Sequence, residues 1–205
     1  MDARLKLIFH PLTPARWPDV EKLFGERGAC GGCWCMAWRL RRADYEAGKG
    51  AGNKSAFQDL VAGNGRPGVL AYADGKPIGW CAVAPREAYV ALGRSRVLAP
   101  VDDHPVWSIT CLFIARPYRR QGVSVRLLEA AVQFARHRGA RVVEGYPIEP
   151  YTTNVPAAFA WTGLVSAFRQ AGFTEVLRRS KARPIMRREC NPLPAGQGPR
   201  KKPRG

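Results

Sequence analysis

The stretch VWSITCLFIARPYRRQGVSVRLLEAAVQFARHRGARVVEGYPI, which spans Val106–Ile148, decides the fold. It begins with a continuous apolar run, residues 106–115, that is typical of a central strand buried on both faces. A helix should extend from about Val123 to Gly139, because five apolar residues recur on one helical face: Leu127, Leu128, Ala131, Val132 and Ala135. A second apolar run, residues 140–148, predicts another strand. A strand, a helix and a strand in this order favour a parallel crossover unit.

Shorter elements on both sides extend this unit into a mixed sheet. Residues 4–9 alternate like a strand, and two apolar runs around Asp74-Gly75 predict a tight hairpin. One helix should follow the first strand, and Asn53 should cap a second helix. A short helix closed by Gly172 and a final pair of strands complete the chain. The predicted order is therefore β-α-α-β-β-β-α-β-α-β-β.

Length and composition indicate a globular protein with a basic surface. The 205 residues suit one domain with a real core, and 46% of them are hydrophobic. We place the domain at residues 1–190. We interpret residues 191–205, which are rich in Pro and Gly, as a disordered basic tail. The net charge of +17 favours anionic partners, which include nucleotide-like cofactors, nucleic acid and acidic surfaces.

The N-terminal residues and the cysteines indicate a reducing compartment. The first 14 residues hold no long apolar run, so we expect neither a signal peptide nor a membrane span. Six cysteines without a secretory signal argue against disulfides. We therefore expect a cytoplasmic protein that does not bind membranes.

The loop RPYRRQG, residues 116–122, has the features of a phosphate site. A helix start leaves backbone N–H groups unpaired and carries a partial positive charge. Gly122 has no side chain, so an anion can approach the backbone there, and arginines flank it. The alternative is a surface loop whose arginines are solvated. The order of strand, loop and helix favours the phosphate site, although the P-loop and G-x-G-x-x-G patterns are both absent.

This loop resembles the signature of the GCN5-related N-acetyltransferase (GNAT) family. The family pattern, Q/R-x-x-G-x-G/A, aligns with Arg119-Arg120-Gln121-Gly122-Val123-Ser124. Ser124 departs from the pattern, because the family usually has Gly or Ala there. The segment LFIARPYRR before the glycine looks like the family's fourth strand, and AFRQAGF, residues 167–173, resembles the ending that precedes its sixth strand. The resemblance is specific over residues 107–145.

The resemblance implies an α/β (α+β) GNAT fold. This fold has a central mixed, mostly antiparallel sheet of about seven strands, flanked by about four helices, with its fourth and fifth strands splayed apart. The implied cofactor is acetyl-CoA, with its pyrophosphate on the amides of residues 119–124 and its pantetheine paired against Leu112, Phe113 and Ile114. Phe168 would pack against the thioester. The implied activity is acetyl transfer to an amine of a small molecule or protein, by direct attack in a ternary complex.

The catalytic acid and base do not carry over from the family. Phe168 stands where the family often has a tyrosine acid, and Ser108 stands where some members carry a glutamate. Glu144, a carboxylate among apolar residues, is a candidate base, and Tyr146 on the same strand face is a candidate proton donor. Glu144 could equally be a structural partner for an arginine. Catalysis by positioning alone is a further alternative.

The segment ACGGCWCMAWR, residues 29–39, combines three cysteines with two tryptophans. By analogy with the family, Trp34, Met36 and Trp38 could form an aromatic wall for a cationic or ring-bearing acceptor. Plain core packing is the alternative. The cysteines are one ligand short of a closed zinc site, so we predict no metal and expect buried free thiols.

Two other functions remain open at this stage. A GNAT-fold module could bind CoA without catalysis, because the acid and base are missing. The basic tail and the positive charge would also suit a nucleic-acid-binding protein, although no RNP, KH or zinc-finger pattern is present. The acceptor, whether a small molecule or a peptide amine, is left open, as is the oligomeric state, with a homodimer among the options.

Overall fold

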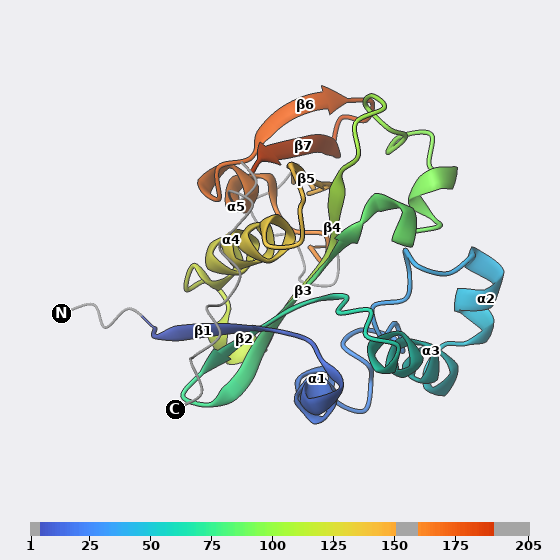
Figure 1. Ribbon diagram of the computed structural model, residues 1–205, viewed down its shortest axis with the longest axis vertical. Helices are drawn as coiled ribbons and strands as arrows, with labels where there is room; N and C mark the ends of the chain where they lie inside the picture. The colour runs from blue at the N-terminus through green and yellow to red at the C-terminus, as the bar shows by residue number, and fades with distance from the viewer. Residues whose placement is uncertain (1–4, 151–159, 191–205) are drawn as a thin grey trace, which may run out of the picture.

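The computed structural model describes residues 5–150 and 160–190, and it consists of one sheet with helices on both faces (Figure 1). The sheet has seven strands in the order β1-β2-β3-β4-β5-β7-β6. Their bounds are β1 Leu7–Pro11, β2 Gly68–Ala73, β3 Lys76–Pro85, β4 Trp107–Ile114, β5 Val142–Gly145, β6 Thr174–Arg178 and β7 Pro184–Glu189. The helices are α1 Trp17–Phe24, α2 Arg42–Ala47, α3 Ala51–Ala62, α4 Val123–Arg136 and α5 Val165–Gln170. The predicted tail, residues 191–205, lies outside the described residues.

The sheet confirms the mixed, mostly antiparallel topology. Strands β4 and β5 pair in parallel, and the other neighbouring strands pair antiparallel. Among the described residues there are five α-helices where about four were expected. The additional helix is α2, which buries no residue, so its sequence carries no apolar periodicity for a prediction to detect.

The start of α3 differs from the expectation. Asn53 does not cap this helix, because Gly50 is its N-cap residue and Asn53 lies within the helix. The Asn53 side chain instead donates hydrogen bonds to the backbone carbonyls of Gly32 and Tyr45, each at 3.2 Å. Asn53 therefore ties the cysteine-containing loop, residues 25–41, and α2 to α3.

One face of the sheet is covered by α4 and α5 (Figure 1). The five apolar residues expected on one face of α4 are all buried against the sheet: Leu127, Leu128, Ala131, Val132 and Ala135. Gly139 follows the helix with φ +88°, which suits the predicted helix ending. The hydrophobic effect thus fixes both the register of α4 and its place beside β4.

The opposite face carries an aromatic cluster contributed by α1, α3 and the cysteine-containing loop. Phe24 lies at its centre, with ring centroids 5.7 Å from Trp34, 6.3 Å from Trp80 and 5.6 Å from Phe113. These contacts anchor the loop to β3 and β4, although the loop has no regular secondary structure.

Strands β4 and β5 separate after a short paired region. They pair at Trp107–Val143, Ser108–Glu144 and Ile109–Gly145. Strand β4 then continues to Ile114, whereas β5 ends at Gly145. The splay expected from the GNAT resemblance is consistent with this geometry, and it opens the sheet beside the second half of β4.

Candidate active site

A cavity of about 390 Å³ lies beside the part of β4 that β5 no longer covers. Its wall contains β4, the loop before α4, the residues that lead into α5, and the start of the cysteine-containing loop. The described lining residues are Ala29, Cys30, Leu112, Phe113, Ile114, Arg119, Ser124, Ala160, Trp161, Gly163, Leu164 and Ala167. The wall is mostly apolar, with one charged side chain at the end nearest α4.

The end of the cavity nearest α4 is built as an anion site. Gly122 is the N-cap of α4 with φ +72° and ψ 3°, a left-handed conformation that glycine adopts without strain. Among the described residues, the amides from Arg120 to Ser124 donate to no backbone carbonyl. No acidic residue lies in the first turn of α4, so nothing there offsets the partial positive charge of the helix start. These features fit a diphosphate.

Two side-chain hydrogen bonds hold the loop before α4 in this conformation. Arg119 Nε donates to the Ile114 carbonyl at 2.8 Å, and Gln121 Nε2 donates to the Pro117 carbonyl at 2.8 Å. The first bond also fixes the guanidinium of Arg119 beside the cavity. Both arginines are exposed, and of the two Arg119 is the one that lines the cavity.

Most residues predicted to bind the cofactor lie at this cavity. Those in its wall are Leu112, Phe113, Ile114, Arg119 and Ser124. Those in the adjoining loop are Arg120, Gln121 and Gly122. The side chain of Val123 is buried in the core, so its amide is the part available to an anion.

Phe168 is not in the cavity wall. It is fully buried in the core, 4.9 Å from the Phe173 ring. Gly145 and Gly163 make room for it, because a Cβ atom would lie 2.1 Å from the ring at Gly145 and 2.7 Å at Gly163. The role predicted for Phe168 against the thioester has no support from this placement, and Leu164 and Ala167 line the cavity in its stead.

A second cavity of about 200 Å³ adjoins the first. The two cavities share Ala29, Cys30, Leu112, Phe113 and Trp161 in their walls. The second cavity is lined in addition by Phe24, Cys33, Cys35, Ala37, Tyr45 and Cys111. Its described wall is aromatic and sulfur-rich, and it contains no carboxylate and no cationic side chain.

The aromatic residues predicted to bind the acceptor lie mainly behind this wall. Trp34 and Met36 are buried in the aromatic cluster. The Trp38 ring contacts Trp161 in a tilted arrangement, with ring centroids 5.8 Å apart, and Trp161 lines both cavities. Among the described residues the buried indole N–H of Trp38 has no hydrogen-bond partner. Trp34 and Trp38 therefore pack behind the lining residues Phe24 and Trp161, and none of the three predicted residues is itself in the described wall.

Most residues of the second cavity were not predicted as site residues, and Trp161, Cys111 and Tyr45 are examples. Trp161 comes shortly after residues 151–159, which are outside the described part of the chain, and it belongs to no local motif. Cys111 looks like an ordinary core residue of β4, and Tyr45 belongs to the unpredicted helix α2. For Cys111 the sequence did contain a signal. Alternate residues of a strand share a face, so Cys111 lies on the same face of β4 as Phe113, which was predicted as a site residue.

Glu144 and Tyr146, the predicted catalytic pair, lie in a buried network outside the described walls of both cavities. Glu144 is fully buried and pairs with Arg86 at 3.1 Å and with Arg187 at 2.8 Å. The Tyr146 hydroxyl donates to Glu144 at 2.7 Å and also contacts the Ser108 hydroxyl at 2.8 Å.

The surroundings of this network favour the structural alternative for Glu144. Burial, and next the charge of Glu144, raise the pKa of Tyr146 well above its ordinary value. A phenol of that kind stays protonated and serves as a hydrogen-bond donor inside the network. The catalytic roles of Glu144 and Tyr146 stay predictions, and the contacts support a role for Glu144 as the partner of two arginines.

The thiols show no metal site in the part of the chain described. No group of three or more His, Cys, Asp or Glu side chains there is arranged to hold a metal ion. All six cysteines are free. None of the helices in residues 5–150 and 160–190 combines the length and the hydropathy that a membrane span needs.

The mixed sheet with parallel β4 and β5, together with the glycine-capped start of α4, defines the class of protein as one with an acetyltransferase fold. Comparison with protein families assigns the chain more closely, because the model of the Acetyltransferase (GNAT) family matches residues 34–158. The protein belongs to this family. No curated protein matches the chain.

Solved structures share this fold at low sequence identity. A GNAT-family acetyltransferase from Listeria monocytogenes has a TM-score of 0.58 and 9% identity, over 93% of this chain and 98% of that one. One from Streptococcus agalactiae has a TM-score of 0.55 and 13% identity, over 91% and 99%. PaiA N-acetyltransferase from Thermoplasma acidophilum, solved in complex with coenzyme A, has a TM-score of 0.51 and 13% identity, over 91% and 100%.

Proposed function

We propose that the protein is an acetyl-CoA-dependent N-acetyltransferase of the cytoplasm that transfers the acetyl group directly to an amine in a ternary complex. The observation that carries the proposal is the cavity that joins the α4 anion site to the open edge of β4. A CoA complex of a protein with the same fold, PaiA, supports acetyl-CoA as the donor.

The residues present suit the two ends of this donor. The free amides of residues 120–124 and the Arg119 guanidinium would hold the diphosphate. The apolar side of β4 around Leu112 and Ile114 would hold the pantetheine arm. Acetyl-CoA supplies an activated acyl group, and the chain binds it, orients it and excludes water.

The second cavity is the proposed acceptor site. It adjoins the first at Leu112, Phe113 and Trp161, so a molecule in it would face the thioester. Its described wall carries no carboxylate to pair with several ammonium groups. We therefore favour an amine on a small apolar or aromatic body, held by Trp161 and Tyr45 through ring and cation–π contacts.

Catalysis by positioning suits this site. The described residues in the two walls include no carboxylate and no imidazole that could act as a general base. The amine must lose its proton before attack, and an apolar cavity favours the neutral form of an amine. Holding the neutral amine beside the thioester carbonyl then lowers the barrier mainly through proximity.

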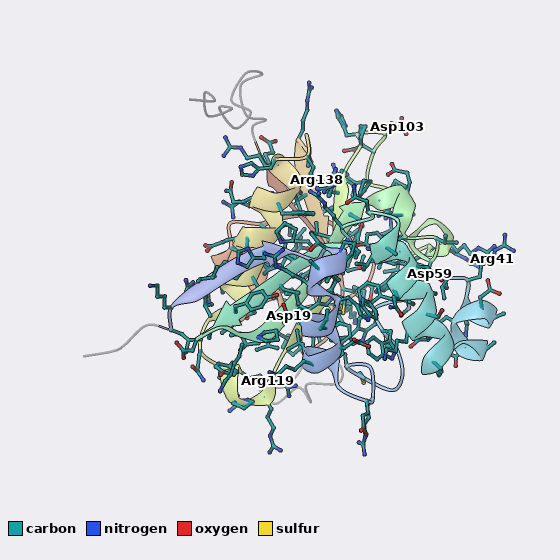
Figure 2. All side chains as sticks on the ribbon, turned by 60° about the horizontal axis from the view of Figure 1, so that its bottom comes forward. Asp19, Arg41, Asp59, Asp103, Arg119 and Arg138 are labelled. Carbon is teal, nitrogen blue, oxygen red and sulfur yellow. The ribbon has the colours of Figure 1, made fainter. Side chains whose placement is uncertain are left out.

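Calorimetry with acetyl-CoA tests the donor site. We expect micromolar binding that survives moderate salt, and at least about tenfold weaker binding in Arg120→Glu and in Gly122→Asp, because each adds negative charge at the helix start. The matched control is Arg138→Glu, which makes the same charge change as Arg120→Glu. Figure 2 shows Arg119 and Arg138 at opposite ends of α4.

Two results would argue against the proposed function. Equal weakening by Arg138→Glu would mean that only the overall charge attracts the nucleotide. Binding without acetylation of any amine, in a screen of arylalkyl and alkyl amines, would favour the alternative of a non-catalytic CoA-binding module.

A further inference from the structure

The acceptor cavity carries a cluster of thiols that amine acetylation does not require. Cys33, Cys35 and Cys111 line the second cavity, and Cys30 lines both cavities. Cys111 lies next to Leu112 on β4, and Leu112 belongs to both walls. The cluster is therefore placed at the end of the donor cavity where the thioester would lie.

Cys35 differs from the other thiols in its contacts. Trp80 Nε1, on a fully buried indole of β3, donates a hydrogen bond to Cys35 Sγ at 3.2 Å. The thiol of Cys111 also interacts with Cys35, and the buried Arg39 guanidinium is near it. All three contacts favour the thiolate over the thiol.

The four cysteines around it are poor nucleophiles or lack these contacts. Burial raises the pKa of Cys33 and of Cys81, and the interaction with Cys35 together with burial raises the pKa of Cys111. The contacts of Cys35 lower its own pKa, with the Cys111 hydrogen bond as the largest cause. Cys30 is exposed at the mouth of the cavity.

The backbone at Cys35 and at the residue before it has a strained conformation. Trp34 and Cys35 have φ values of +44° and +61°, in a region that non-glycine residues rarely adopt. Trp34 is fixed by stacking on Trp17, and its indole packs where a side chain at Gly28 would clash. Backbone strain of this kind gathers at functional sites, and here it turns Cys35 toward Trp80 and Cys111.

We propose that Cys35 is a second acetyl acceptor, a thiol that takes the acetyl group from acetyl-CoA when no amine fills the cavity. The inference rests on the proposed function, because it needs acetyl-CoA in the adjoining cavity. Cys35 Sγ, after loss of its proton to solvent, attacks the acetyl carbonyl. A new C–S bond forms to Cys35, the C–S bond to CoA breaks, and the CoA thiolate takes a proton from solvent.

The exchange converts one thioester into another, so it needs no further reactant and is reversible. Free CoA would remove the acetyl group from Cys35 by the same steps. Acetyl-Cys35 would also occupy part of a cavity of about 200 Å³, so an amine and the modification should exclude each other.

Mass spectrometry after incubation with acetyl-CoA alone tests the inference. We expect one acetyl group on the peptide that contains Cys35, removed by excess free CoA and by neutral hydroxylamine. Cys35→Ser should lose this modification, and the matched control Cys33→Ser, in the same cavity, should keep it. Acetylation that persists in Cys35→Ser, or that lies on Cys30 or Cys33, would overturn the inference.

Alkylation of the protein without acetyl-CoA gives an independent measurement. The rate at which iodoacetamide modifies Cys35 should reach half of its maximum at a lower pH than the rate for Cys33. The titratable and charged groups that face Cys35 are Arg39, Cys33, Cys81, Tyr89 and Cys111. Trp80→Phe keeps a ring in the core and removes the N–H donor. It should slow alkylation of Cys35 at neutral pH by about tenfold and leave Cys33 unchanged.

Calorimetry on the same sample distinguishes a failure of this inference from a failure of the proposed function. If acetyl-CoA binds and Cys35 stays unmodified, the inference fails while the proposed donor site stands. If acetyl-CoA does not bind, both fail.

Discussion

Glu144 is a fully buried carboxylate between two arginines, and this setting predicts a large effect of its removal on stability. In Glu144→Ala, the largely buried guanidinium of Arg86 loses its carboxylate partner, and Arg187 keeps only its pair with Asp102 at the exposed side of the network. Losing one partner of a buried ion pair costs about 3–5 kcal/mol. Urea unfolding should therefore show a free energy of unfolding lower by about 3 kcal/mol or more.

The same variant decides between the two roles of Glu144. For a structural partner, kcat/KM of the folded fraction should change little, and Asp102→Asn should have a much smaller effect on stability. Asp102 pairs with Arg187 at 2.6 Å from the exposed side of the network. A loss of more than about a hundredfold in kcat with unchanged stability would instead identify Glu144 as a general base.

Gly145 gives a second prediction at the scale of one residue. A Cβ atom there would lie 2.1 Å from the Phe168 ring, and Phe168 is fully buried. Gly145→Ala should therefore lower the free energy of unfolding by about 1–3 kcal/mol through overpacking, as thermal unfolding would measure. Gly145→Ala with Phe168→Leu should be less destabilised than the sum of the two single variants. Additive losses would mean that the ring does not respond to the new methyl group.

The cysteine-containing loop is held as an element by tertiary contacts, and Asn53 provides the strongest test of this. Its side chain joins Gly32 in the loop and Tyr45 in α2 to α3. Asn53→Ala should lower the free energy of unfolding by about 1–3 kcal/mol, because two partly buried carbonyls lose the donor that the buried Asn53 side chain supplies. It should also raise KM for the amine more than it raises the Kd of acetyl-CoA, because the loop contributes more residues to the wall of the second cavity, the proposed acceptor site, than to the wall of the first.

One outcome would contradict this assignment of the loop. A rise in the Kd of acetyl-CoA in Asn53→Ala as large as the rise in KM for the amine, measured by calorimetry, would mean that the loop supports both sites equally. The control is Gln58→Ala, which removes an exposed amide side chain from the same helix and should change the free energy of unfolding by less than about 1 kcal/mol.

At the scale of the whole molecule, the charge of +17 predicts two kinds of anion binding that salt separates. Any binding of RNA through the surface charge releases counterions, so its affinity should fall by about a thousandfold between about 50 and 200 mM salt. Binding of acetyl-CoA also depends on backbone amides and apolar contacts, and should weaken by less than about tenfold over that range. Fluorescence titration measures both. RNA binding that resists salt would indicate a specific RNA site.

The local elements and the donor loop could be predicted from the sequence because their signals are local. The apolar stripe of α4, Gly122 at its start and the buried run of β4 are read within a few residues of each other, and the structure has each of them. The family model confirms the GNAT resemblance that these residues carry. Helix α2 has no such signal, because it buries no residue.

The partners of side chains were decided only by the tertiary structure. Glu144 looks like a candidate base until Arg86 and Arg187, 58 and 43 residues away, are seen beside it. Cys30, Cys33 and Cys35 look alike in the sequence. Cys35 differs from the other two because Trp80 of β3 donates a hydrogen bond to its sulfur. Such contacts join residues far apart in the chain, so their energies depend on packing that no local pattern encodes. The sequence therefore determines the elements and the anion loop, whereas the fold decides which buried groups meet and what chemistry they can carry out.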